Sequence, residues 1–348
     1  MKIRKILWIL MLLFLPSMVY ANVGTPLMWA QNFYLLIGNA VIGIIEGLLV
    51  AAIFKRPKKH STIFFIILNY VSMLIGVAII AFVDSYGFEK IIITIENAKI
   101  FMFVSFIYFY LITLFVEFPF ILGFFLKEKD RFKKGIKATL IVNTVSYMLL
   151  LPLYWLASSA TLVNELEVVS TSDMDLPNNY DIYYISDNGK DVLKSDLDGK
   201  NKEIVYSTSD IEKRDYLVTV QNEKETFDLY INYKKEMIRE DFTDFASEKD
   251  FNKSRYKVGE LHRNETWEYY IGAWAVEGIR GKNNSGEFFR YAVETPFVSW
   301  QIKNGTHIEK DLLIFQLGND QIVAFRHEKK QISLIAKGFG PVVVQRKP

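Results

Sequence analysis

Four long apolar runs dominate the first half of the chain. They cover residues 33–54, 62–83, 100–125 and 138–156, and charged side chains are almost absent from them. A helix needs about 20 residues to cross the roughly 30 Å of hydrocarbon in a bilayer. A buried helix of this length in a soluble protein would carry a polar face, and these runs barely do. The pattern therefore predicts an α-helical membrane bundle of four transmembrane helices within residues 22–156.

The residues before the first run have the form of a secretory signal peptide. Residues 1–5 are basic, residues 6–15 are apolar, and small or β-branched side chains stand at Val19 and Ala21. This order of segments is typical of a signal that is removed after export. We expect residues 1–21 to be a cleaved signal peptide, with an uncleaved signal anchor as the alternative. Under either interpretation the chain after the signal starts on the far side of the membrane.

The short loops between the runs predict the orientation of the bundle. Residues 55–59 carry four basic side chains, and residues 127–137 carry six basic against two acidic ones. The loop over residues 84–99 has no basic excess. Loops rich in Lys and Arg stay in the cytoplasm. The first and third loops are therefore expected inside, and the chain beyond the fourth helix outside, which agrees with the export signal.

Charge divides the chain at the same place. Residues 1–156 hold 15 Lys and Arg against 7 Asp and Glu, a net of +8, whereas residues 157–348 hold 26 against 32, a net of −6. The whole chain is 51% hydrophobic and has no cysteine. These values exclude an ordinary cytoplasmic enzyme, a disordered chain, a disulfide scaffold and a cysteine zinc site. The acidic half also argues against a nucleic-acid partner.

The second half of the chain has the pattern of short strands. Residues 157–181 are polar and without periodicity, and we expect a linker there. From residue 182 onward, short β-type runs alternate with turn residues such as Asn188-Gly189 and Asp198-Gly199. Such pairs supply the positive φ that tight hairpins need. Residues 182–348 are therefore predicted to form a mostly antiparallel all-β extracytoplasmic domain, with helix considered only around residues 240–249.

A faint internal repeat lies within this domain. Shifted by 131 residues, the segment 184–207 overlays the segment 315–338, and both read as strand, tight turn, strand, polar turn, strand. The stretch 182–200 resembles a blade of the β-propeller repeats found in bacterial envelope proteins of the TolB type. The resemblance covers about 25 residues twice. It implies a propeller-like domain of about four blades, because a blade takes roughly 40 residues; a β-sandwich is the alternative.

Polar side chains interrupt all four apolar runs at similar depth. Glu46 and Glu117 each stand eight residues before the inner end of a run, about 12 Å at 1.5 Å per residue. A carboxylate in hydrocarbon is costly, so it usually faces the bundle interior and marks function. We predict an intramembrane polar layer that either holds a proton or cation or joins the helices by hydrogen bonds. Its members are Asn39, Glu46, Asn69, Glu117, Asn143 and Ser146.

Small residues in the first run indicate close helix packing. Gly43 and Gly47 form a Gly-x-x-x-Gly pair, which lets a second helix approach the backbone.

No catalytic set appears in the outer domain. His262, His307 and His327 share no ligand spacing, and nucleophile-elbow, phosphate-loop and dinucleotide motifs are missing. We therefore assign no catalytic residue, metal or cofactor. The sequence predicts a multi-pass protein of the bacterial inner membrane, surrounded by lipid, whose β domain binds an envelope protein or a small ligand without catalysis. The alternative is a small transporter or proton- or cation-coupled subunit that uses Glu46 and Glu117.

Overall fold

The structure is a computed structural model in which the chain divides into two compact units. A helical unit holds residues 34–93 and 97–157, and a β unit holds residues 94–96 and those from 161 onward. The expected signal peptide lies outside the described residues. The structure describes residues 34–85, 93–157, 161–208, 211–212, 215–244, 246, 255–261, 267–271, 278–295 and 297–346.

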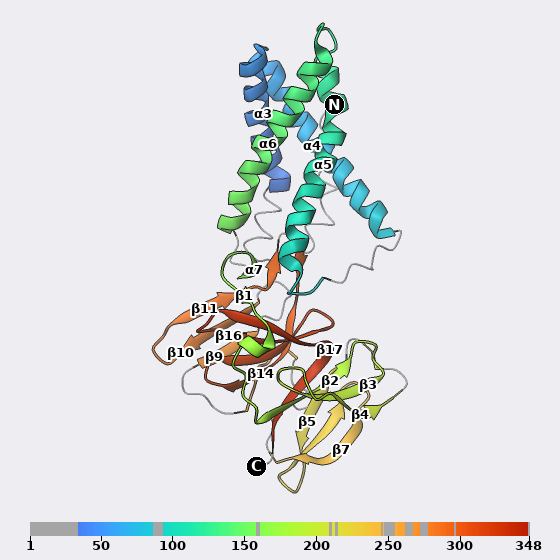
Figure 1. Cartoon of the computed structure of the whole chain (residues 1–348), viewed down its shortest axis with the longest axis vertical. Helices are drawn as coiled ribbons and strands as arrows, with labels where there is room; N and C mark the ends of the chain where they lie inside the picture. Colours follow the sequence, from blue (N-terminus) through green and yellow to red (C-terminus); the bar gives the residue numbers. More distant parts are fainter. Residues whose placement is uncertain are drawn as a thin grey trace, which may run out of the picture. The chain divides into compact units, whose positions relative to one another are not determined.

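The helical unit contains four helices that are long and apolar enough to cross a membrane (Figure 1). They are α3 (Asn39–Phe54), α4 (Lys58–Ser85), α5 (Ala98–Phe124) and α6 (Arg131–Ala157), and a π-helical turn, η1 (Tyr34–Gly38), precedes α3. Their length and composition confirm the four-helix prediction and indicate a multi-pass membrane protein.

Helices α3 and α4 touch along their backbones. A Cβ atom on Gly43 would lie 2.6 Å from the Cα of Ile66, and one on Gly47 would lie 2.5 Å from the Cα of Thr62. Atoms that are not bonded do not approach so closely, so only glycine fits at either position. The two glycines of the Gly-x-x-x-Gly pair thus set the spacing between α3 and α4.

The two basic loops meet at one end of the bundle. Arg56, between α3 and α4, hydrogen-bonds to Glu128, between α5 and α6. Glu128 also accepts a hydrogen bond from Lys134. The Arg56 guanidinium lies 5.6 Å from the centre of the Phe124 ring. Both loops therefore stay on the same side of any membrane that the helices cross.

The largest sheet of the β unit has nine strands and curves into a half-barrel that does not close. Its order is β4-β3-β2-β17-β16-β15-β14-β8, and β1 pairs with β17. Among the described strands only β1–β17 and β14–β8 are parallel pairs. The bounds are β1 Glu167–Val168, β2 Tyr180–Ser186, β3 Asp191–Asp196, β4 Glu203–Ser207, β8 Gly259–Glu260, β14 Ile302–Glu309, β15 Leu312–Leu317, β16 Gln321–Arg326 and β17 Gln331–Gln345.

Three smaller antiparallel sheets complete the described part of this unit. They join β5-β6-β7, β9-β10-β11 and β12-β13. The prediction of a mostly antiparallel β domain is confirmed. The bounds are β5 Leu217–Gln221, β6 Phe227–Ile231, β7 Glu236–Thr243, β9 Trp267–Ile271, β10 Ile279–Asn283, β11 Phe288–Tyr291, β12 Glu294–Thr295 and β13 Val298–Ser299.

The two copies of the sequence repeat form similar three-stranded units within one sheet. The first copy is β2-β3-β4 and the second is β15-β16-β17, each an antiparallel meander. Their registers differ by one residue, since Ile185 pairs with Val192 whereas Gln316 pairs with Ile322. Strand β17 of the second copy then pairs with β2 of the first. The resemblance to propeller blades stays a prediction.

Two segments differ from what the sequence suggested. Residues 161–181, expected to be a linker, are packed into the β unit, where they form α7 (Thr161–Asn164), β1 and the 3₁₀ turn η2 (Thr171–Asp173). Leu162, Leu166 and Met174 are buried there, although their spacing shows no period. Residues 240–243 continue β7 instead of starting a helix. Strand β7 is an edge strand, so its charged side chains face solvent and obscure the strand pattern.

Candidate functional sites

The first candidate site is a group of polar side chains inside the helical unit. Glu46 is only 1% exposed, because the glycines on either side of it bring α4 against α3. Its carboxyl group accepts a hydrogen bond from Asn69 Nδ2 on α4 at 2.5 Å. The other oxygen, Oε1, lies 2.5 Å from Ser146 Oγ on α6. Three helices therefore meet at one carboxyl group.

Glu117 of α5 lies in the same region and is 2% exposed. Asn143 Nδ2 on α6 donates to its carboxyl group at 3.0 Å. Ser72 of α4 lies beside the same carboxyl group. Because Asn143 and Ser146 are three residues apart, they share one face of α6 and connect the two glutamates.

The two asparagines have matching surroundings. Besides the glutamate, Asn69 Nδ2 donates to the backbone oxygen of Phe65 at 3.0 Å. Asn143 Nδ2 donates in the same way to Thr139 at 3.1 Å. Each amide group thus divides its two hydrogens between the preceding helical turn and a carboxyl group. This arrangement fixes the direction in which each asparagine presents its second hydrogen.

Five of the six residues assigned to the polar layer come together, and we call Glu46, Asn69, Glu117, Asn143 and Ser146 the carboxyl cluster. Asn39 is buried outside this set, with Nδ2 3.0 Å from the sulfur atom of Met73. Sequence reasoning missed Ser72. Ser72 stands three residues after Asn69, just as Ser146 stands three residues after Asn143. This shared spacing could have identified Ser72 from the sequence.

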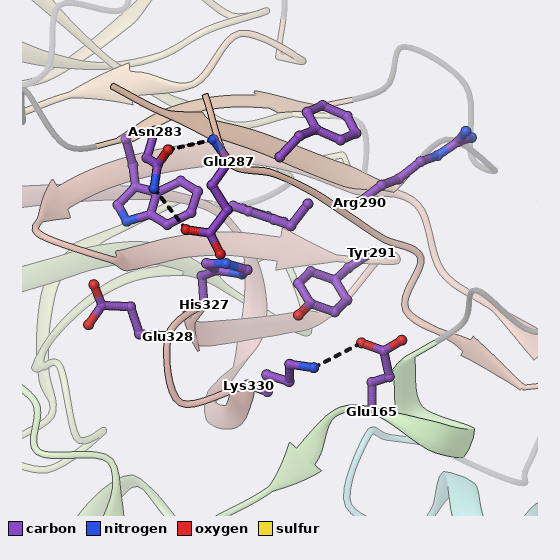
Figure 2. A pocket seen from close by; sticks show the side chains of 11 residues that line it. Glu165, Asn283, Glu287, Arg290, Tyr291, His327, Glu328 and Lys330 are labelled. Atoms are coloured by element: carbon purple, nitrogen blue, oxygen red, sulfur yellow. Dashed lines mark hydrogen bonds and ion pairs between the residues drawn. The ribbon is translucent and has the colours of Figure 1, made fainter. Parts of the chain in front are cut away.

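The second candidate site is a pocket of about 580 Å³ in the β unit (Figure 2). Strand β9, the β10–β11 hairpin, the turn between β16 and β17, and the residue after α7 form its walls. The residues that line it are Glu165, Trp267, Asn283, Glu287, Phe288, Phe289, Arg290, Tyr291, His327, Glu328 and Lys330.

Aromatic side chains form one part of the pocket wall. Trp267, Phe289 and Tyr291 are buried. The His327 ring stacks on Phe289, with 3.7 Å between ring centres and 14° between ring planes. Burial lowers the pKa of His327, which favours the neutral ring. With the ring neutral, this part of the pocket carries no charge of its own.

The polar side chains of the pocket leave an excess of negative charge. Lys330 pairs with Glu165 at 3.4 Å, and Arg290 points away from the other side chains in Figure 2. Glu287 receives a hydrogen bond from Asn283 at 2.9 Å, and its carboxylate lies above His327 in the same view. Glu328 is exposed at the edge. With Lys330 paired to Glu165, the lining has the two further carboxylates of Glu287 and Glu328 against one guanidinium, that of Arg290, so its net charge is −1.

Sequence reasoning interpreted the histidines of this domain as isolated surface or strand residues. His262 lies outside the described residues. His307 and His327 are both buried against aromatic rings, and burial lowers the pKa of each. The aromatic side chains that enclose the two histidines come from other strands, so the sequence around each histidine does not reveal its burial. Within the described ranges, no group of three or more potential metal ligands occurs.

The chain matches no protein-family model, no curated protein and no solved structure.

Proposed function

We propose that this is a multi-pass protein of the bacterial cytoplasmic membrane whose β unit lies outside the cytoplasm and binds a small ligand. The basic loops at 55–59 and 127–137 support this orientation, because positively charged loops are retained in the cytoplasm. The signal-like sequence at 1–21 supports export of the chain that follows. The proposed role is binding or sensing, without catalysis.

The pocket carries this proposal, and its composition points to the class of ligand. A concave site with an aromatic wall and a few convergent polar groups is the usual form of a small-molecule site. Here the carboxylates of Glu287 and Glu328 outnumber Arg290, the one basic group of the lining that no acidic side chain of the pocket pairs in the described residues. Carboxylates attract a cation, and an aromatic face attracts it further. We propose a ligand in which a positively charged amine adjoins an apolar group.

Benzylammonium and benzyl alcohol test this proposal as a matched pair of probes, since they differ in charge and share the ring. Full-length protein in lipid nanodiscs is titrated with each probe, and binding is followed by ligand-observed NMR. We expect benzylammonium to bind several-fold more tightly than benzyl alcohol. Removing the charge of both carboxylates, in Glu287→Gln/Glu328→Gln, should abolish this preference.

Glu223→Gln is the matched control, because Glu223 is exposed on the β unit and does not line the pocket. This variant should keep the preference of the wild-type protein. Equal binding of the two probes, or a preference that survives the double substitution and falls in the control, would reject the proposed ligand class.

A second candidate function is a proton- or cation-coupled membrane subunit. The observation that favours it is the convergence of four helices on two buried carboxyl groups, which ligand binding in the β unit does not require.

A further inference from the structure

The Ser146 hydroxyl lies between two oxygen atoms and has only one hydrogen to donate. Ser146 Oγ lies 2.5 Å from Glu46 Oε1 and 2.9 Å from the backbone oxygen of Val142. A serine hydroxyl has one hydrogen and donates once. The hydroxyl therefore donates fully to only one of the two oxygens at a time, and a neutral Glu46 would supply the second hydrogen through its own O–H group.

Two states of the same geometry follow from this count. In one state Glu46 is a neutral acid that donates to Ser146, and Ser146 donates to Val142. In the other state Glu46 is a carboxylate, and the Ser146 hydroxyl turns to donate to it. Both states keep the short contact between Glu46 and Ser146. The Val142 oxygen loses only its second hydrogen bond, because the α6 backbone already supplies a first.

The asparagines cannot change their pattern in the same way. Asn69 uses both amide hydrogens, on Phe65 and on Glu46, and Asn143 uses both, on Thr139 and on Glu117. Each therefore holds its glutamate in place in either protonation state. Ser146 is the member of the carboxyl cluster whose hydroxyl changes its acceptor when Glu46 gains or loses its proton.

The surroundings favour uptake of a proton. In the described part of the helical unit, no Lys, Arg or His side chain hydrogen-bonds to either glutamate. The nearest basic residue along α3 is Lys55, about 13 Å away at 1.5 Å per residue. Burying two carboxylates without a counter-charge costs much free energy, and the negative charge of each increases the cost of ionising the other. A proton removes one of these charges at no cost in packing.

The other ionisable groups nearby do not supply that counter-charge. Helix α3 brings no further ionisable side chain, and α4 brings Asn69 and Ser72 to the carboxyl groups. The α4 side chain of Tyr70 donates to the Leu36 oxygen instead. From α5 and α6, Tyr110 contacts Thr144 at 2.9 Å and Tyr147 contacts Thr113 at 3.1 Å. Both tyrosines are neutral hydroxyls, so they leave the charge of the glutamates uncompensated.

We infer that the carboxyl cluster binds and releases a proton, and that the Ser146 hydroxyl changes its acceptor between Val142 and Glu46 as it does so. On release, the O–H bond of Glu46 breaks and its proton leaves to solvent, while the Ser146 hydroxyl keeps its own O–H bond and rotates to donate to the carboxylate. This links the charge inside the bundle to the direction of the hydrogen bond between Glu46 of α3 and Ser146 of α6. The inference does not depend on the ligand proposed for the β unit.

Infrared difference spectroscopy of full-length protein in nanodiscs tests this directly, because a neutral carboxylic acid has a carbonyl band that a carboxylate lacks. We expect an acid band at neutral pH that disappears reversibly as the pH is raised. Glu46→Gln and Glu117→Gln identify its source by removing it. Ser146→Ala removes the partner of Glu46 in both states. The carboxylate loses the stronger, charge-assisted hydrogen bond, so the band should persist to higher pH, by about one unit.

Ser61→Ala is the matched control, because Ser61 is a fully buried α4 serine whose Oγ contacts no polar partner within the described residues. It should titrate as the wild type does. Ser146→Ala keeps both glutamates, so the test does not rely on a glutamate variant that folds. The inference is overturned by an acid band that is absent at every pH or that never titrates. It is equally overturned if Ser146→Ala titrates at the same pH as Ser61→Ala.

Discussion

At the scale of single residues, the level of a side chain along its helix was readable from the sequence, whereas the direction in which it points was not. The helical rise predicted that Glu46, Glu117 and the two inner asparagines lie at one level, and the structure brings them together. Rotation about each helix depends on packing against the other helices. Ser72, unnoticed in the sequence, therefore lies beside Glu117. Asn39 shares the face of α3 that carries Glu46, but two helical turns, about 10.5 Å along the axis, separate it from the carboxyl cluster.

Lys303 of β14 provides a residue-scale prediction about pH. Its side chain is buried, with the residue 6% exposed, and burial together with the charge of Arg255 lowers its pKa to about 8. An unfolded chain holds this proton up to about pH 10.4. Between these two pH values the unfolded state binds more protons, so the stability of the β unit should rise with pH. Lys303→Met should remove this rise and stabilise the protein below pH 8.

Urea unfolding of the wild type and the variant, followed by tryptophan fluorescence from pH 7 to 10.5, measures the difference. Lys329→Met is the control, because Lys329 is exposed. A Lys303→Met variant with the same pH dependence as the wild type would show that the lysine is solvated in solution.

At the scale of elements, long periodic or uniformly apolar segments were predictable and short strands at edges were not. The four helices were predictable because each apolar run is long enough to cross a membrane. The hairpins of β2-β3 and β15-β16 are marked by turn residues, which give the antiparallel pairing. Strand β7 carries charges on its exposed side, and the segment 161–181 gains order only by packing on the sheet, so neither shows a local pattern.

The contact between α3 and α4 gives a prediction at this scale. In Gly47→Ala, the new methyl group would meet the Thr62 backbone, so the helices must separate, at a cost of about 1–3 kcal/mol for overpacking. Gly76→Ala is the matched control on α4, because nothing lies within 4 Å of its Cβ position. It should gain up to about 1 kcal/mol from helix propensity.

Denaturant titration of the helical unit within the full-length protein, read by circular dichroism in mixed micelles, compares the two variants. Equal stabilities for Gly47→Ala and Gly76→Ala would show that the α3–α4 contact is looser than the structure describes.

At the scale of the whole molecule, the sequence predicted the structural class of the two units, helical and antiparallel β, but not the strand topology of the β unit. Alternating short runs indicated an antiparallel β unit. The half-barrel depends on pairing between β2, near the start of that unit, and β17, at its end, and no local pattern carries such a long-range register. The pocket is missing from the sequence for the same reason, because β9, the β10–β11 hairpin and the β16–β17 turn meet only in three dimensions.

The proposed function depends on the orientation of the protein in the membrane, because a pocket that binds a ligand from outside the cell must face outward. The chain has no cysteine, so single cysteines report position cleanly. Lys202→Cys places one on an exposed turn of the β unit, and Lys129→Cys places one in the exposed loop between α5 and α6. In intact spheroplasts, a membrane-impermeant maleimide should label Lys202→Cys at once and Lys129→Cys only after lysis. Labelling of Lys129→Cys in sealed cells, with Lys202→Cys protected until lysis, would contradict the account.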